Sequence, residues 1–225
     1  MTTVVVFDLD DTLYPERSFV ESGFRAVGTH ALERWGIRDL GDACLSAAKA
    51  GIRNSVFQWA YRDVVGAELT PERAHELLRV YREHQPDRLP WHPDALETVR
   101  LLHGRFPLTL LSDGYLPTQA NKARALGLER WIDEPVFTES LGREHWKPSK
   151  RGFEIIMSRH KPDSTFFYIG DNPTKDFIAP RALGWHTVHI TRPTGTYALN
   201  KAAQDQAADR QVTSLLDLAA LLCVL

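Results

Sequence analysis

Acidic side chains gather near the start of the chain in the segment Asp8-Leu9-Asp10-Asp11-Thr12, directly after the apolar run 3–7. Where a strand turns into a loop, carboxylates two residues apart can both project toward one site. Two close carboxylates suit a hard cation that prefers oxygen ligands. They also suit a nucleophile paired with a general acid/base, because like charges at short range push their pKa values apart. Acidic turns are common after strands, so this segment alone leaves a structural role open.

A hydroxyl and a lysine follow at two later positions. Ser112-Asp113-Gly114 comes after the apolar run 107–111, and its hydroxyl and backbone N–H groups could bind a phosphoryl oxygen. Lys147, in the segment Trp146-Lys147-Pro148, offers a compact positive charge that would reduce repulsion between a carboxylate and a phosphate. Taken alone, the first is an ordinary turn and the second a solvated lysine.

A second acidic segment follows the run 165–169. Gly170 allows a close backbone approach, and Asp171 and Asp176 come after it. These two carboxylates could complete an octahedral site for a cation with oxygen ligands. The alternative for Asp171 is an N-cap of the next helix.

These polar segments depend on strands and helices to bring them together. The intervening helical patterns cover 117–127, 149–160 and 173–183, the last with Pro173 in its first turn and Gly184 after its end. Strands alternating with such helices predict an α/β fold with a Rossmann-like parallel sheet, in which ligands bind outside the carboxyl ends of the strands. The predicted strands are 3–7, 107–111, 135–138, 165–169 and 186–190.

One stretch interrupts this alternation. Nothing between 16 and 85 resembles a strand, and helical patterns cover about 20–35, 40–50, 53–65 and 71–85. Thr70-Pro71 is typical of an N-cap followed by a first-turn proline. We therefore predict an α/β core formed by 1–15 and 86–225, with a four-helix-like domain, 16–85, inserted into it.

With the four polar segments in this order, the chain resembles the haloacid dehalogenase superfamily of phosphohydrolases over essentially its whole length. Segment 7–13 (Phe-Asp-Leu-Asp-Asp-Thr-Leu) resembles the first motif of that family and 111–114 (Leu-Ser-Asp-Gly) the second. Lys147-Pro148 resembles the third motif, and 170–176 (Gly-Asp-Asn-Pro-Thr-Lys-Asp) the fourth. The helical insert is similar to the cap of the subgroup that has its insertion after the first motif.

The resemblance implies Mg²⁺-dependent hydrolysis of a small-molecule phosphate monoester, such as a sugar phosphate or nucleotide. Asp8 would be the nucleophile that forms an aspartyl-phosphate, and Asp10 the general acid and then the general base. Mg²⁺ would bind Asp8, the backbone carbonyl of Asp10 and Asp171, with Asp176 binding the ion or orienting a bound water. The residues implied to bind or support the phosphoryl group are Thr12, through its hydroxyl, Ser112, Asp113, Gly114 and Lys147.

Four other functions are compatible with parts of this pattern. A haloacid dehalogenase has a similar aspartate nucleophile, but uses neither Mg²⁺ nor a second acid, so Asp10, Asp171 and Asp176 argue against it. A phosphomutase with a similar cap would isomerise a sugar phosphate without releasing phosphate. A receiver domain would be shorter and would lack the insert. A non-catalytic binding protein of the same fold would not require all four motifs to be filled.

Composition limits the partners and the compartment. The formal net charge of −2 over 225 residues provides no basic field for nucleic acid, so a small-molecule partner is expected. Cys44 and Cys223 do not form a disulfide framework, and two reduced thiols in apolar surroundings fit a reducing cytoplasm. No stretch approaches the ~20 apolar residues of a membrane span.

Two questions stay open at the level of sequence. In the helical insert, Arg53, Trp59, Tyr61 and Arg62 could meet a substrate, although Trp59 in the core of the insert and arginines on its solvated face are the simpler interpretation. The segment 215–225 is typical of an amphipathic helix that packs on the core or on a second subunit, which leaves a homodimer possible.

Overall fold

The protein divides into two compact units in a computed structural model that describes residues 2–197, 203 and 206–223. One unit comprises Met1–Glu16 and Arg88–Leu225, and the other comprises Arg17–Asp87. The first is an α/β unit and the second is entirely helical.

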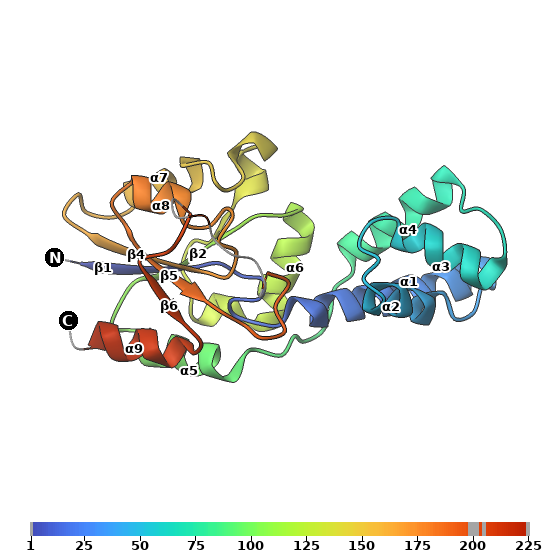
Figure 1. Ribbon diagram of the computed structural model, residues 1–225, viewed down its shortest axis with the longest axis horizontal. Helices are drawn as coiled ribbons and strands as arrows, with labels where there is room; N and C mark the ends of the chain where they lie inside the picture. Colours follow the sequence, from blue (N-terminus) through green and yellow to red (C-terminus); the bar gives the residue numbers. More distant parts are fainter. Residues whose placement is uncertain (1, 198–202, 204–205, 224–225) are drawn as a thin grey trace. The chain divides into compact units, whose positions relative to one another are not determined.

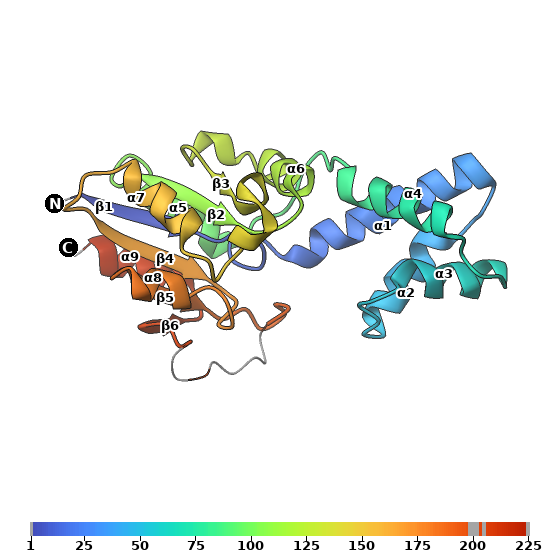
Figure 2. The same cartoon turned by 90° about the horizontal axis from the view of Figure 1, so that it is seen from above.

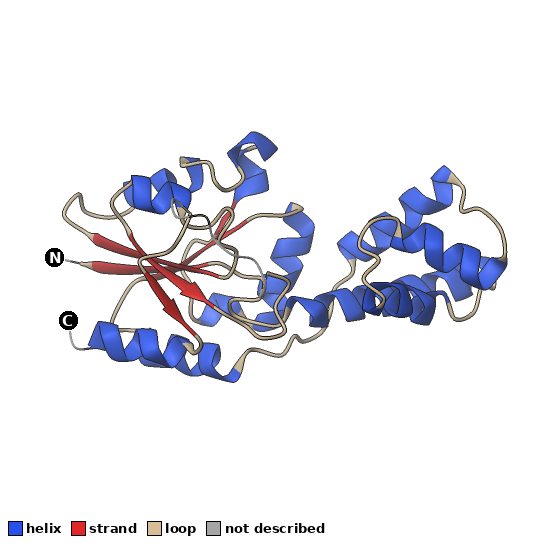
Figure 3. Ribbon diagram, viewed as in Figure 1, coloured by secondary structure: helices blue, strands red, loops and turns tan. Residues whose placement is uncertain are grey.

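The α/β unit is built on a six-stranded sheet, as counted over the described residues, in which every neighbouring pair is parallel (Figures 1 and 3). The strand order is β3-β2-β1-β4-β5-β6. The predicted Rossmann-like parallel sheet is therefore confirmed. The strands are β1 (Thr3–Phe7), β2 (Leu108–Ser112), β3 (Val136–Phe137), β4 (Thr165–Gly170), β5 (His186–Ile190) and β6 (Arg210–Val212).

Helices cover both faces of this sheet. In Figure 1 and, seen from above, in Figure 2, α7 and α8 lie on one face, and α5 and α9 lie on the other, where they contact each other. The helices are α5 (Pro93–Leu102), α6 (Leu116–Leu126), α7 (Arg151–Ser158), α8 (Ile178–Ala182) and α9 (Leu215–Cys223), with short 3₁₀ helices at Leu128–Arg130, Thr138–Leu141 and Arg143–His145. Double coverage explains why the predicted strands do not alternate cleanly between apolar and polar residues.

The side chains at the centre of the sheet are buried and mostly apolar. All five residues of β2 are buried, and Val4 and Val6 of β1 pack with Phe153 of α7 in one hydrophobic cluster. Such burial stabilises the sheet by about 25 cal/mol per Å² of apolar surface removed from water. It also fixes the register, because a shift of one residue would turn these side chains to the opposite face.

The register brings the carboxyl ends of three strands to one edge. Phe7 of β1 is paired with Leu110 of β2 and with Ile169 of β4. The residues that directly follow these pairs in each strand therefore leave the sheet together, including Asp8, whose backbone N–H still donates to the carbonyl of Ile169 at 2.8 Å.

The structure differs from the predicted elements in three places. The helix predicted for 173–183 begins at Ile178, because residues 173–177 form turns held by the side chain of Asn172, which accepts from the backbone N–H of Thr174 at 3.1 Å. The helix α5 was not predicted, and neither was β6. Strand β6 has two exposed polar residues, Arg210 and Gln211, and sits at the sheet edge, so it lacks the apolar signal of the inner strands.

Helix α9 packs on its own chain. Leu215, Leu218, Ala219 and Leu222 are buried, and the backbone N–H of Leu215 donates to Asp94 at 2.8 Å. Residues 224–225 and the side chain of Cys223 lie outside what the structure describes. Of the two alternatives for this helix, packing on the core therefore accounts for its apolar face.

The helical unit contains α1 (Glu16–Trp35), α2 (Leu40–Lys49), α3 (Val56–Val65) and α4 (Pro71–Glu83). The stripe predicted on α1 packs inward, with Val27 and Ala31 fully buried. Helices α1 and α2 approach closely at Gly41, where a Cβ atom would lie 2.8 Å from the carbonyl oxygen of Phe24. The N-cap at Thr70 forms as expected, with its hydroxyl accepting from the backbone N–H of Arg73 at 3.4 Å.

The side chains of the insert that could meet a substrate have different surroundings. Tyr61 is buried and accepts a hydrogen bond from Arg73. Trp59 is 40% exposed, so its predicted place in the core of the insert is wrong: it lies on the outer face of a short helix. The arginines are exposed as expected, Arg62 in an ion pair with Glu68 and Arg53 at the edge of a cavity within this unit.

None of the helices in the described part of the chain combines the length and apolar character that crossing a membrane requires.

Candidate active site

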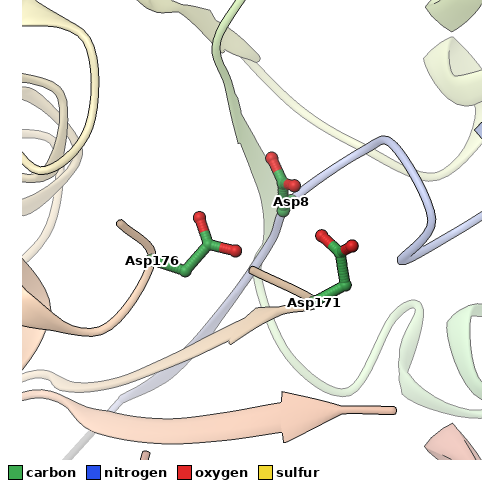
Figure 4. A group of neighbouring side chains, drawn as sticks. All are labelled: Asp8, Asp171 and Asp176. Atoms are coloured by element: carbon green, nitrogen blue, oxygen red, sulfur yellow. The ribbon is translucent and has the colours of Figure 1, made fainter. Parts of the chain in front are cut away.

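Three carboxylates converge at the carboxyl edge of the sheet. Asp8 leaves the end of β1, and Asp171 and Asp176 come from the loop after β4, with their side chains turned toward one another (Figure 4). One oxygen from each residue lies within 4.8 Å of the other two, and all three residues are buried. The sequence predicted all three as metal ligands, and the structure brings them together.

A buried ammonium group lies among these carboxylates. The Nζ atom of Lys147 is 2.7 Å from Oδ1 of Asp8 and 2.8 Å from Oδ1 of Asp176. It also donates to the Tyr168 hydroxyl at 2.8 Å, and the Lys147 side chain has no exposed surface. The ammonium group contacts two of the three carboxylates, and the cluster has a formal charge of −2 when all three are ionised.

The pKa values of these groups reflect the imbalance. Burial raises the pKa of Asp8 to about 6, with Lys147 opposing and Asp176 adding to the increase. The pKa of Asp171 stands well above its usual range because the group is buried beside Asp176 and Asp8. Burial favours neutral Lys147, but the carboxylates of Asp176 and Asp8 outweigh it and hold its pKa well above the ordinary value.

The end of β4 is shaped to hold Asp176. A Cβ atom at Gly170 would lie 2.4 Å from Oδ2 of Asp176, so only glycine leaves room for this carboxylate. The same oxygen accepts from the backbone N–H of Asn172 at 2.9 Å. His189 of β5 lies with Nε2 3.0 Å from the carbonyl oxygen of Asp171. The backbone of this loop therefore positions the Asp176 carboxylate, and the His189 side chain contacts the backbone at Asp171.

This donor set fits a divalent cation. It consists of carboxylate oxygens, which are hard ligands of the kind that Mg²⁺ prefers. A charge of +2 would neutralise the excess of −2 and would offset the burial of like charges that raises the pKa values of Asp8 and Asp171. The residues present are thus suited to hold the metal that the resemblance implies.

The second predicted segment lies beside this cluster. Ser112 ends β2 and is 1% exposed, and its hydroxyl accepts from Nε2 of Gln119 at 2.7 Å. Asp113 has partners of its own: its carboxylate accepts from the backbone N–H of Lys147 at 3.1 Å and pairs with Lys175 at 3.1 Å. Despite burial, these lysines lower the pKa of Asp113. Asp113 thus holds the lysine-bearing segment in place.

Asp10 has surroundings quite unlike those of Asp8. Lys122 of α6 donates to both of its carboxylate oxygens, at 2.8 and 2.9 Å. The hydroxyl of Tyr14 donates to Oδ1 at 2.5 Å, and Gln119 donates to Oδ2 at 3.1 Å. Burial acts to raise the pKa of Asp10, but the charge of Lys122 and these hydrogen bonds outweigh it and lower the pKa.

Thr12 is held by its backbone rather than by its side chain. Its carbonyl oxygen accepts from Nη2 of Arg192 at 2.9 Å, whereas its buried hydroxyl has no hydrogen-bond partner among the described residues. The predicted support of the loop through the Thr12 hydroxyl is therefore wrong in detail. The loop is instead fastened by Arg192 and by Asp11, whose carboxylate accepts from the backbone N–H of Thr196 at 2.7 Å.

A cavity of about 220 Å³ opens at this edge of the α/β unit. Glu16 and Tyr197 also line it, and burial together with Asp10 raises the pKa of Glu16 to about 7, against the opposing effect of Lys122. The predicted site residues that line the cavity are Asp8, Asp10, Asp113, Lys147 and Asp171.

Sequence reasoning missed the side chains behind Asp10 and Ser112. Gln119 and Lys122 lie on α6, and both are at least 95% buried, at 1% and 5% exposure. The available signal was their spacing of three residues, which places two polar side chains on one face of the helix after the second motif. No pattern in the sequence indicated that this face is directed at Asp10.

The chain matches a family model and characterised relatives. The model of haloacid dehalogenase-like hydrolases matches residues 2–184. A glyceraldehyde 3-phosphate phosphatase of Methanopyrus kandleri is 28% identical over 85% of this chain and 85% of the relative. A ribulose-1,5-bisphosphate 5-phosphatase of Halopiger xanaduensis is 26% identical over 96% of this chain and 97% of the relative.

Solved structures share the fold. The crystal structure of a 2-haloacid dehalogenase from Pseudomonas syringae superimposes with a TM-score of 0.63 over 100% of this chain and 99% of that one, at 21% identity. This likeness concerns the fold alone, so the chemistry has to be argued from the residues at the site.

Proposed function

The chain belongs to the haloacid dehalogenase-like hydrolases and is a phosphatase, and we propose that it hydrolyses a small-molecule phosphate monoester through an aspartyl-phosphate at Asp8, with Mg²⁺ as cofactor. One observation carries this proposal. Asp8 lies within 2.7 Å of the buried ammonium group of Lys147 and beside Asp171 and Asp176. A carboxylate and a phosphate repel each other, so Asp8 can attack phosphorus only where nearby positive charge reduces that repulsion.

The first half-reaction transfers the phosphoryl group to the protein. An oxygen of Asp8 bonds to phosphorus as the ester P–O bond breaks, and the leaving alkoxide takes a proton from the carboxyl group of Asp10. Asp10 is a carboxylate in the free protein, because its pKa is lowered, and the negative charge of the bound phosphate is proposed to raise that pKa so that Asp10 carries the proton in the substrate complex. Lys147 and the Ser112 hydroxyl hold the phosphoryl oxygens, and each such donor is worth about 3–4 kcal/mol in a transition state.

The second half-reaction releases phosphate. Asp10, now a carboxylate, takes a proton from a water molecule whose oxygen bonds to phosphorus as the Asp8–phosphorus bond breaks. The hydrogen bonds from Lys122 and Tyr14 favour this carboxylate form of Asp10. Asp10 lines the same cavity as Asp8, which is where both proton transfers must occur.

The metal would be held by Asp8, Asp171, Asp176 and the backbone carbonyl of Asp10. When bound, Mg²⁺ supplies the positive charge that lowers the repulsion between a dianionic phosphate and these carboxylates. Lys147 alone leaves the cluster at −2, so the residues themselves do not neutralise the site.

The substrate is proposed to be a phosphorylated metabolite of small size. Two relatives named as phosphatases of a triose phosphate and a pentose bisphosphate support a sugar phosphate among the candidates. A nucleotide or another phosphate monoester remains within the same proposal.

The charged residues at the site favour hydrolysis over dehalogenation. A dehalogenase needs neither a second acid nor a metal site, whereas this chain buries Asp171 and Asp176 beside Asp8 at an energetic cost. A bound cation would offset the energetic cost of burying these like charges.

The proposal is tested by measuring inorganic phosphate released from a panel of phosphate monoesters, with Mg²⁺ and with EDTA. The expected result is release from at least one member, dependent on Mg²⁺. Sugar phosphates are analysed in parallel by NMR, because an isomerised sugar phosphate without free phosphate would identify a mutase. No turnover of any member, in a correctly folded sample, would contradict the proposed reaction.

A further inference from the structure

Helix α6 directs two buried polar side chains at the site. Gln119 and Lys122 are three residues apart and therefore neighbours on one face of the helix. They are 1% and 5% exposed, whereas glutamine and lysine side chains are exposed in most proteins. Neither belongs to the four motifs that the sequence analysis identified.

Lys122 fixes the orientation of Asp10. Its Nζ atom is 2.8 Å from Oδ1 and 2.9 Å from Oδ2, so it bridges both oxygens of one carboxylate. The Tyr14 hydroxyl adds a third contact at 2.5 Å. A carboxylate bound at both oxygens cannot rotate about its terminal torsion without breaking these contacts, and its orientation toward the cavity is set.

Gln119 links Asp10 to the phosphoryl-binding segment. Its Nε2 atom lies 3.1 Å from Oδ2 of Asp10, 2.7 Å from the Ser112 hydroxyl and 2.9 Å from the carbonyl oxygen of Asp113. An amide nitrogen has two hydrogens, so it serves two of these three acceptors fully at a time. By donating to Ser112 it leaves the hydroxyl proton of Ser112 available for a phosphoryl oxygen.

The backbone beside Gln119 is adapted to it. Gly114 has a φ of +134°, and a Cβ atom there would lie 3.0 Å from Cδ of Gln119. The glycine of the second motif therefore leaves room for this amide as well as permitting the backbone conformation.

We propose that Lys122 and Gln119 are positioning residues, which hold Asp10 in the orientation for proton transfer and couple that orientation to the phosphoryl-binding hydroxyl of Ser112. The inference rests on the proposed function, because Asp10 exchanges a proton only if the reaction runs as described. Both residues act through others and touch neither the substrate nor the phosphorus.

The test is a double-mutant cycle between Lys122 and Asp10 with an aryl phosphate and saturating Mg²⁺. Lys122→Met is expected to lower kcat by about 10- to 100-fold, as misplacement of a reacting group does, with KM changed less than twofold. In an Asp10→Ala background the same change should alter kcat less than twofold, because there is no carboxylate left to position.

Matched control variants distinguish a loss of Asp10 positioning from a general loss of stability. Arg124→Met removes a positive charge from the exposed face of the same helix and should leave kcat and the melting temperature unchanged. Lys122→Arg should recover part of the lost kcat. An equal loss in the Asp10→Ala background, or a loss below twofold in the single variant, would overturn the role of Lys122.

Gln119→Leu tests the second link and keeps the Lys122–Asp10 pair. The inhibition constant of inorganic phosphate should rise several-fold, because the Ser112 hydroxyl loses the hydrogen bond donated by Gln119. Lys122→Met should leave this inhibition constant unchanged. An unchanged inhibition constant and kcat would overturn the role of Gln119.

A crystal structure of Lys122→Met provides a readout that does not need turnover. The Asp10 carboxylate should leave its wild-type orientation; if it stays, the positioning role is wrong even where wild-type activity is normal. Should wild-type protein release no phosphate from any ester, the proposed function fails, and this structure still decides whether Lys122 orients Asp10.

Discussion

Asp8 and Asp10 are two residues apart in the chain, yet their surroundings are opposite. Asp8 shares one ammonium group with Asp176 and lies beside Asp171, and burial raises its pKa to about 6. Asp10 accepts from Lys122 at both carboxylate oxygens and from two further donors, and its pKa is lowered. Groups of the protein thus stabilise Asp10 as a carboxylate, whereas the cluster around Asp8 keeps an excess of buried negative charge.

The difference follows from the elements that face each residue. Asp8 continues β1 between β2 and β4, so it meets the acidic loop after β4. Asp10 lies one turn further, where helix α6 supplies a lysine and an amide. In the proposed mechanism these similar acids have different roles, with Asp8 as a nucleophile and metal ligand and Asp10 as a proton carrier. Four predictions test this contrast.

The largest effect is expected for Asp8→Asn. Loss of the nucleophile should reduce kcat roughly 10⁴-fold or more, since groups that form the covalent intermediate carry most of the catalytic effect. Steady-state kinetics measure the loss, and circular dichroism checks that the fold is intact. Appreciable turnover by this variant would falsify the assignment of Asp8 and remove the contrast with Asp10.

Asp10→Asn should cost less, about 10²- to 10⁴-fold, the usual range for a general acid/base. Its effect should be larger for an alkyl than for an aryl phosphate, because a good leaving group needs little protonation. Rapid-quench trapping of the phosphoenzyme should show both half-reactions slowed. Equal losses for both leaving groups would contradict the role of Asp10 as the general acid.

The third prediction concerns stability in EDTA. A carboxyl group whose pKa is about 6 in the folded state and near 3.8 in the unfolded chain binds its proton more tightly when folded. Asp8 therefore makes the free energy of unfolding fall as the pH rises between these two values, by up to about 3 kcal/mol. Thermal melts at several pH values measure this.

Mg²⁺ should reverse that loss above pH 6, because it binds the ionised carboxylates of the folded state. Asp8→Asn serves as the matched control: it should flatten the fall in EDTA and weaken the response to Mg²⁺. A metal-free protein with no decline in stability over this window would show that the Asp8 cluster is satisfied without a cation, as Asp10 is.

The smallest effect is expected for Thr12→Val, which lies between the two regions. Its buried hydroxyl has no partner among the described residues, and its backbone carbonyl still accepts from Arg192. Replacing an unsatisfied hydroxyl by a methyl group should leave the free energy of unfolding unchanged or raise it by up to about 1 kcal/mol. A loss greater than that in denaturant unfolding would mean that the hydroxyl supports the loop after all.

Much of the fold was predictable because inner strands are marked by composition. The runs around β1, β2, β4 and β5 are apolar since both faces of the sheet are covered, and that signal is local. The edge strand β6 was not predicted, since its exposed polar residues give no such signal. The helix before Gly184 was predicted too long because the turn around Asn172 depends on side-chain hydrogen bonds.

The candidate site divides in the same way. Asp8, Asp171 and Lys147 were predicted because their motifs follow or lie between strands whose carboxyl ends meet at one edge. Gln119 and Lys122 were missed, because burial of a helix face depends on which segment packs against it. Thr12 was predicted to support the loop through its hydroxyl, but it does so through its backbone carbonyl, which accepts from Arg192. That partner could not be predicted, because it lies 180 residues away in the chain.

The sequence by itself determined the class of fold, the order of the motifs and the kinds of chemical groups available, since all of these follow from local composition and spacing. Only the tertiary structure decided that Lys147 contacts both Asp8 and Asp176, and that Lys122 contacts both carboxylate oxygens of Asp10. The physical reason is that a carboxylate's pKa and orientation depend on charges and donors within a few ångströms. For Asp8 and Asp10 those groups lie more than 100 residues away in the chain, at Lys147, Asp171 and Lys122.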